Sequence, residues 1–218
     1  MKKVDINSIY RIVKKFVTKF EVPSVNKMGL VKRDVYRVLI ATILSARSKD
    51  EVTEKVSEQL FSKANNLEEL SKLSYEEIKE AIKPIRFYNN KTRYLKNLPE
   101  VINKEFKGKI PDEIEDLVKL PGVGRKTANL VLIVGFEKPA MCVDVHVHRI
   151  MNRLGYLKTK DNFETEMELR EKLPKEYWLE WNKLFVSFGQ NHCRPQSPHC
   201  SSCPIIKDCN QIKVGRKR

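Results

Sequence analysis

The sequence predicts an all-α protein. Apolar residues recur at intervals of three and four along most of its 218 residues, which is the period of a helix with one buried face. Alternating patterns typical of strands are scarce, and VDVHVH (143–148) is the only clear candidate. Hydrophobic residues make up 41% of the chain, which allows a packed core, and the length suits one large domain or two small ones.

A first amphipathic helix is expected near the N-terminus. One face carries Lys14, Lys15 and Lys19. The other face is apolar at the helical spacing, with Ile6, Ile9, Val13, Phe16, Val17 and Phe20.

Capping residues mark the starts of the next helices. Asp34 can cap VYRVLIATILSA, whose apolar character predicts a place in the core. Asp50 can cap EVTEKVSEQLFSK, and Ser74 with Glu77 matches a capping box ahead of EEIKEAIK.

The second half of the chain continues the helical pattern. Pro111 and Asp112 open EIEDLVKL, and Pro121 ends it because proline cannot continue a helix. Further helical patterns follow at KTANLVLIVGF, FETEMELREKL and PKEYWLEWNKLFVSFGQ.

The charge balance is strongly basic. The chain has 42 Lys and Arg against 28 Asp and Glu, which gives a net charge of +14. A solvated lysine-rich surface would usually balance Lys with Glu, so the excess favours a polyanionic partner, most simply nucleic acid. Charge alone does not choose among DNA, RNA and anionic lipid. No apolar run could span a bilayer and MKKVDINSIY is no signal peptide, so we expect an intracellular, cytoplasmic, nucleoid-associated protein that uses no membrane.

The segment LPGVGRKTANLVL (120–132) places two glycines before two cations and an apolar run. A nucleotide-binding P-loop is excluded, because Arg125 and Leu120 stand where that motif needs glycine. A helix-hairpin-helix suits the segment better. Gly122 and Gly124 can adopt backbone angles closed to other residues, and their amides can bind a nucleic-acid phosphate beside Arg125. The alternative is a helical turn whose glycines serve packing alone.

Lys126 follows in the first turn of the second predicted helix. An amine beside a bound backbone is a candidate nucleophile. An isolated lysine in this position would more simply contact phosphate or solvent.

Two further groups of residues could bind or react. Asp144, His146 and His148 form a D-x-H-x-H pattern, and alternate positions share one face of a strand, so metal binding is one interpretation. Four cysteines follow with the spacing C-x6-C-x2-C-x5-C, and in an intracellular chain such clusters indicate metal before disulfide. Zinc sites more often have two short-spaced pairs. Cys142 stands apart and is expected to be a small buried residue. The clustered set is Cys193, Cys200, Cys203 and Cys209.

The order of hairpin, aspartate and cysteines resembles the endonuclease III family of DNA glycosylases, in the helix-hairpin-helix superfamily. Asp144 lies eighteen residues after Lys126 (144 minus 126), and the similarity runs from about Asp34 to Cys209. The resemblance implies two helical domains flanking a DNA-binding cleft. A helical barrel with the helix-hairpin-helix would take residues 28–138, and an iron-sulfur cluster domain would take 1–27 and 139–218.

The resemblance also implies an activity. The family's bifunctional members remove oxidised pyrimidines in base excision repair and cleave the strand as abasic-site lyases. Lys126 would attack C1′ and form a Schiff base, and Asp144 would stabilise the cationic sugar. A [4Fe-4S] cluster would bind the four cysteines, and the partner would be double-stranded DNA with damaged bases or abasic sites. His146 would shape the active site, and Arg194 would contact a phosphate. A monomer is taken as the default state of the protein.

The sequence departs from the family at two places. Arg47 replaces the Gln of the common LSAQ, and Arg86 and Phe87 begin a segment that commonly reads G-L/I-Y-N. Arg47 could bind an orphaned guanine and Phe87 could enter the base stack, which predicts a preference for lesions opposite G. The simpler interpretation makes Phe87 a core residue and Arg47 a phosphate contact.

Two other functions stay open on the sequence. A mismatch glycosylase that removes T or U opposite G would also suit Arg47. A non-enzymatic DNA-binding module that bears a cluster would need neither Lys126 nor Asp144.

Overall fold

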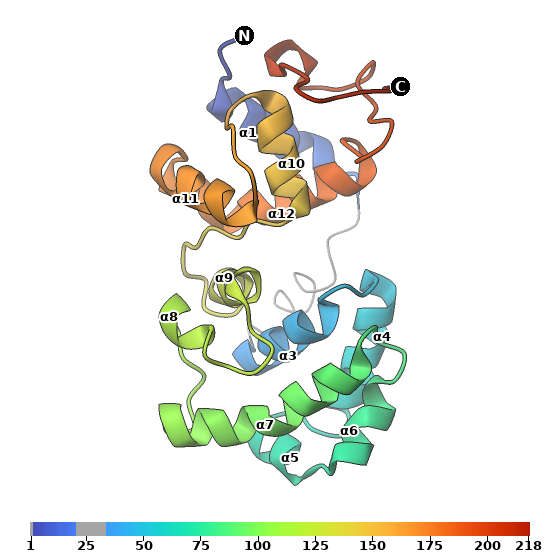
Figure 1. The fold of residues 1–218 in the computed structure, drawn as a ribbon, viewed down its shortest axis with the longest axis vertical. Helices are drawn as coiled ribbons and strands as arrows, with labels where there is room; N and C mark the ends of the chain where they lie inside the picture. The colour runs from blue at the N-terminus through green and yellow to red at the C-terminus, as the bar shows by residue number, and fades with distance from the viewer. Residues whose placement is uncertain (1, 21–33) are drawn as a thin grey trace. The chain divides into compact units, whose positions relative to one another are not determined.

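The computed structural model describes residues 2–20 and 34–218, and this part of the chain is helical with no strand. The predicted all-α class is therefore confirmed. The chain divides into two compact units (Figure 1). The central unit is Ser24–Ala140, and the terminal unit is Met1–Pro23 with Met141–Arg218. The expected limits, 28–138 against 1–27 and 139–218, stay a prediction, because their first boundary lies outside the described residues.

The central unit is organised around one buried helix. Helix α3 (Val35–Ser45) buries residues 38–44 without a break and contacts α4, α7 and α9. The sequence reading of this segment as core is confirmed, and Asp34 caps it by accepting a hydrogen bond from the Arg37 N–H. The other helices are α4 (Asp50–Phe61), α5 (Leu67–Lys72), α6 (Tyr75–Ile82), α7 (Tyr88–Phe106), α8 (Ile114–Leu117) and α9 (Arg125–Val134).

The other predicted helix starts had mixed outcomes. The capping box is present, because the Glu77 N–H donates to Ser74 Oγ and the Ser74 N–H donates to Glu77 Oε2. The second of these hydrogen bonds lowers the pKa of Glu77. The prediction that Asp50 is a cap is wrong. Lys49 holds that position, and Asp50 lies in the first turn, where its charge complements the helix dipole.

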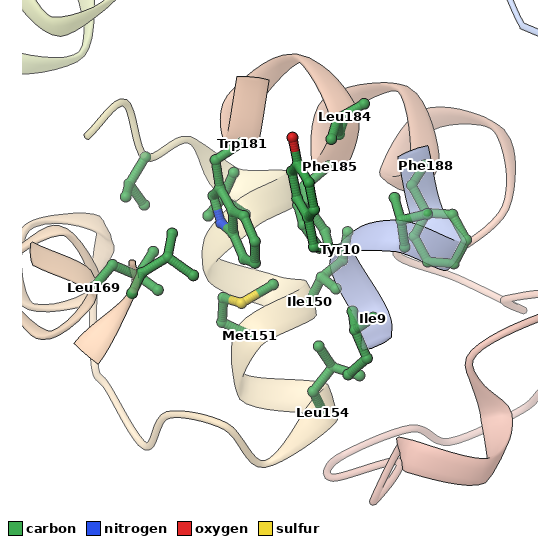
Figure 2. Packing of buried hydrophobic residues seen from close by; sticks show 14 of the residues in the cluster. Ile9, Tyr10, Ile150, Met151, Leu154, Leu169, Trp181, Leu184, Phe185 and Phe188 are labelled. Carbon is green, nitrogen blue, oxygen red and sulfur yellow. The ribbon is translucent and has the colours of Figure 1, made fainter. Parts of the chain in front are cut away.

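The terminal unit packs helices from both ends of the chain. Its helices are α1 (Ile6–Val17), α10 (Val145–Leu154), α11 (Asn162–Lys172) and α12 (Trp178–Asn191), with short 3₁₀ turns at Lys175–Tyr177 and Ile206–Asp208. Both α1 and α10 pack against α12. Figure 2 shows Trp181, Phe185 and Phe188 of α12 among Ile9 and Tyr10 of α1 and the apolar face of α10.

The predicted strand at 143–148 is wrong. Asp144 is the N-cap of α10, and Val145 begins the helix. The alternation covers only the first turn, whereas Val147, Ile150, Met151 and Leu154 continue at the helical spacing and are buried. Within the described ranges, no helix is long and apolar enough to cross a membrane.

Trp181 provides a test of the terminal core. Its indole is fully buried, and the ring centroid lies 4.4 Å from that of Phe185. Trp181→Ala should lower the free energy of unfolding by roughly 3–5 kcal/mol, because it leaves a large cavity. Trp181→Phe should cost less, because the indole N–H that it removes has no hydrogen-bond partner among the described residues. Urea denaturation measures both, and equal losses would contradict this packing.

Candidate functional site

The glycine hairpin before α9 has one residue with a special backbone conformation. Gly122 has φ +78°, and a Cβ built there would lie 2.6 Å from Cδ2 of Tyr94. Gly124 has φ −95° and ψ 176°, an extended conformation that any residue adopts. The expectation of glycine-only angles is confirmed for Gly122 and wrong for Gly124. Gly124 is the N-cap of α9 and brings no side chain to cover the first-turn amides.

Two cations occupy the first turn of α9. Arg125 and Lys126 are exposed, while residues 128–133 are buried and the helix contacts α3. No acidic residue lies in this turn. Cations at a helix N-terminus oppose the helix dipole, so helix stability does not explain them. A phosphate bound at the hairpin amides would favour both cations.

Asp144 is a buried carboxylate in the terminal unit. It is 6% exposed, and its Oδ1 accepts hydrogen bonds from the N–H groups of His146 (2.9 Å) and Val147 (3.0 Å). These bonds cap α10 and fix the direction of the carboxylate. Capping therefore gives Asp144 a structural role besides any chemical one.

The two histidines of the D-x-H-x-H pattern contact different groups. His146 Nδ1 lies 3.1 Å from Nη2 of Arg149, whereas His148 Nδ1 lies 2.7 Å from Oγ1 of Thr165. Positions two apart on a helix lie on opposite sides, so the expected shared face is absent. In the described part of the chain, no group of three His, Cys, Asp or Glu side chains could hold a metal ion.

Arg149 joins the histidine to the cysteine segment, which the sequence did not predict. Its Nη2 donates to the carbonyls of Gly189 (3.1 Å) and Cys193 (2.9 Å). Gly189 allows this approach, because a Cβ there would lie 2.7 Å from His146 Nδ1. Burial lowers the pKa of Arg149 from its usual value. The arginine thus links His146 to the first residue of the cysteine set.

The four clustered cysteines line one cavity with apolar residues such as Ile150 and Phe188. Burial raises the pKa of Cys203 to about 12, and it also raises the pKa of Cys200 and Cys209. Thiols in such surroundings ionise when a metal binds them. Cys142 is 1% exposed, so its prediction as a small buried residue is confirmed.

Arg153 supports the loop that follows Cys193. Its Nη1 lies 3.5 Å from Cys193 Sγ and donates to the Arg194 carbonyl at 2.7 Å, while Nη2 donates to the Pro195 carbonyl at 2.7 Å. The Arg194 side chain is exposed. The loop backbone is therefore held from inside while Arg194 faces solvent.

Arg47 and Phe87 come together in the central unit. The Arg47 guanidinium carbon lies 5.6 Å from the centroid of the Phe87 ring, and that of Arg86 lies 5.4 Å from it. Phe87 is 47% exposed, so its interpretation as a core residue is wrong. Both Arg47 (φ 58°) and Phe87 (φ 61°) have positive φ, which is uncommon for large side chains.

Comparisons with known proteins agree on one family. Residues 40–175 match the HhH-GPD superfamily base excision DNA repair protein model. Endonuclease III of Thermotoga maritima is 46% identical over 81% of this chain and 83% of its own length. Endonuclease III of Bacillus subtilis is 39% identical over 87% of this chain and 85% of its own length.

Solved structures give the same result. The structure of a trapped endonuclease III–DNA covalent intermediate matches with a TM-score of 0.84 and 35% identity, over 94% of each chain. A thermostable thymine-DNA glycosylase matches with a TM-score of 0.83 and 27% identity, over 95% of this chain and 96% of that one. By its sequence and its fold together, the chain belongs to the endonuclease III family of the HhH-GPD superfamily of base excision DNA repair proteins.

Proposed function

We propose that this chain is a bifunctional DNA glycosylase and abasic-site lyase that removes oxidised pyrimidines through Lys126. The observation that carries the proposal is the exposed position of Lys126 in the first turn of α9, directly after the hairpin. An amine there lies beside any DNA backbone that the hairpin amides bind. The buried residues of α9 pack against the core of the central unit, so the helix that carries Lys126 is held in place.

The family supports this reaction. Endonuclease III homologues are DNA glycosylases and abasic-site lyases, and one matching structure is described as a trapped covalent endonuclease III–DNA intermediate. Covalent capture of a sugar carbon requires a nucleophile, which Lys126 supplies. The mismatch alternative is less favoured, because the thymine-DNA glycosylase match is 27% identical and the endonuclease III of Thermotoga maritima is 46% identical. The two residues that the non-enzymatic module would not need, Lys126 and Asp144, are both present.

The reaction follows from the chemistry of an amine and a carboxylate. The Lys126 nitrogen bonds to C1′ while the glycosidic bond breaks, and the base leaves with that bond's electron pair and gains a proton. The Asp144 carboxylate stabilises the positive charge that develops on the sugar. The sugar ring then opens to an imine, which acidifies the C2′ proton. Loss of that proton expels the 3′ phosphate and breaks the strand.

The remaining residues bind the duplex in this proposal. The amides at Gly122 and Gly124, with Arg125, bind phosphate on one strand, and Arg194 binds another phosphate. Arg47 and Phe87 fill the gap that the extruded base leaves, and Arg47 binds the orphaned base. His146, held by Arg149, shapes the pocket around the reacting sugar.

The four thiols suit an iron-sulfur cluster. They come from one short segment, line one cavity, and no three of these described side chains are placed to hold a single ion. In a [4Fe-4S] cluster each of four thiolates binds a different iron, so they need not meet at one point. When bound, the cluster would cross-link residues 193–209 and take no part in base removal. Arg153 would hold the adjacent loop, and with it Arg194, in place for DNA.

Borohydride trapping tests the lysine. We expect a covalent protein–DNA adduct on a duplex with one oxidised pyrimidine, and none with Lys126→Ala, because reduction captures the Schiff base. Electrophoresis of the reduced mixture measures the adduct. A Lys126→Ala enzyme that still removes the base would refute the assignment.

Asp144→Asn is the matched variant in that experiment. Asparagine caps a helix as well as aspartate does, so α10 should stay intact while the charge is lost. Base removal should slow by about tenfold or more, while trapping on a preformed abasic site should change less. Equal rates for Asp144→Asn and the parent would show that Asp144 acts only as a cap.

Alanine substitutions at the two hairpin glycines test whether the backbone conformation of Gly122 matters for DNA binding. Gly122→Ala should weaken binding to an abasic-site duplex by about tenfold, because its Cβ overlaps Tyr94 and positive φ is strained. Gly124→Ala should change binding by about twofold or less, because its backbone is extended and no atom lies within 4 Å of the added carbon. Fluorescence anisotropy measures both, and equal weakening would contradict a special role for Gly122.

Metal analysis tests the cysteines. The purified protein should be coloured and contain about four irons per chain. Cys203→Ser should lower the iron content, whereas Cys142→Ser, a buried cysteine outside the set, should leave it unchanged. A colourless parent protein with stoichiometric zinc would overturn the cluster.

A further inference from the structure

The central unit contains a buried lysine that the proposed reaction does not use. Lys91 is 4% exposed, and its Nζ donates to the carbonyls of Leu44 and Ala46, each at 2.7 Å. Its third partner is Ser48 Oγ at 3.3 Å. Burial lowers the pKa of Lys91 to about 8. Burying a cation against neutral oxygens costs stability, so the presence of a lysine at this buried position calls for an explanation.

All three acceptors belong to the turn that carries Arg47. Leu44 lies near the end of α3, Ala46 is its C-cap, and Ser48 follows Arg47. Lys91 thus binds the backbone immediately before Arg47 and the side chain immediately after it. A positive φ at arginine persists only where the surroundings fix it, and these bonds do so.

Lys91 also stands one helical turn from Phe87. Its N–H donates to the Phe87 carbonyl at 3.2 Å, and Phe87 is the N-cap of α7. One residue therefore joins the two segments whose side chains meet in the Arg47–Phe87 contact. Without the Lys91 ammonium, the turn at 46–48 would stay joined to α3 through the backbone, but it would lose its hydrogen bonds to Lys91 of α7.

We propose that Lys91 is a positioning residue that orders Arg47 and Phe87 in advance, as one wedge that enters the duplex when the damaged base leaves. The proposal rests on the function proposed above. Extruding a base costs free energy, and a wedge that is already ordered loses less conformational entropy on entering the stack. Lys91 would therefore affect opening of the duplex and leave the covalent chemistry of Lys126 unchanged.

The same helix offers a matched control. Lys96 of α7 donates its Nζ to the carbonyls of Ser71 (3.1 Å), in the last turn of α5, and Leu73 (2.7 Å), its C-cap. Lys96→Met removes the same kind of bonds as Lys91→Met, from a turn that holds neither Arg47 nor Phe87. A loss of general stability would affect both variants.

The test compares a substrate that must be opened with one that is already open. Single-turnover cleavage is measured on a duplex with an oxidised pyrimidine opposite G, and borohydride trapping on a single strand with an abasic site. Lys91→Met should slow the duplex reaction by about tenfold and change single-strand trapping by less than about twofold. Lys96→Met should change neither rate by more than about twofold. A 2-aminopurine next to the lesion should lose its fluorescence rise on binding only with Lys91→Met.

Parallel losses on both substrates, or no loss on the duplex, would overturn the positioning role. If Lys91→Met does not fold, Lys91→Gln decides, because it keeps N–H donors on a shorter side chain. An unchanged ratio of duplex to single-strand rates in Lys91→Gln would also overturn the role. Failure of the proposed function would look different, because the parent protein itself would then form no adduct on either substrate.

Discussion

The burial of residues 38–44 of α3 is the constraint on which the central unit depends. This helix contacts α4, α7 and α9, so it supports both the helix that presents Lys126 and the one whose N-cap is Phe87. Its last carbonyls find no donor within the helix and need partners from elsewhere. Lys91 supplies them at Leu44 and Ala46. The hydrogen bonds that satisfy this helix end thus place a rigid connection beside the exposed Arg47–Phe87 contact.

In the terminal unit, the residue that caps α10 is also the carboxylate proposed to act in the reaction. Asp144 holds the first turn of α10 with one carboxylate oxygen, and the same turn starts the helix that carries His146 and Arg149. From the same helix, Arg149 donates a hydrogen bond to the Cys193 carbonyl, and Arg153 donates one to the Arg194 carbonyl in the next loop. In the proposed reaction, Asp144 is thus fixed in direction by the helix that it caps, which is the preorganisation that electrostatic stabilisation of a cation requires.

Features that depend on neighbouring residues could be predicted from the sequence, and features that depend on distant ones could not. The all-α class, the Asp34 cap, the Ser74–Glu77 box and the positive φ of Gly122 follow from short spacings. VDVHVH was misread because one turn of helix is too short to show its period. The contacts of Lys91 and Arg149 join residues 47 and 44 positions apart, and carbonyl acceptors leave no trace in side-chain identity.

The net charge of +14 contains cations of two kinds. Arg125 and Lys126 are exposed in the first turn of α9, where an anion bound at the helix N-terminus would favour both cations. Lys91 is instead buried and Arg149 is half-buried. Burial lowers the pKa of both side chains, and backbone carbonyls accept their hydrogen bonds. Because a carboxylate would also neutralise their charge, carbonyl partners keep the local potential positive. Lys91 and Arg149 therefore leave the protein more attractive to a polyanion than cations paired with carboxylates would.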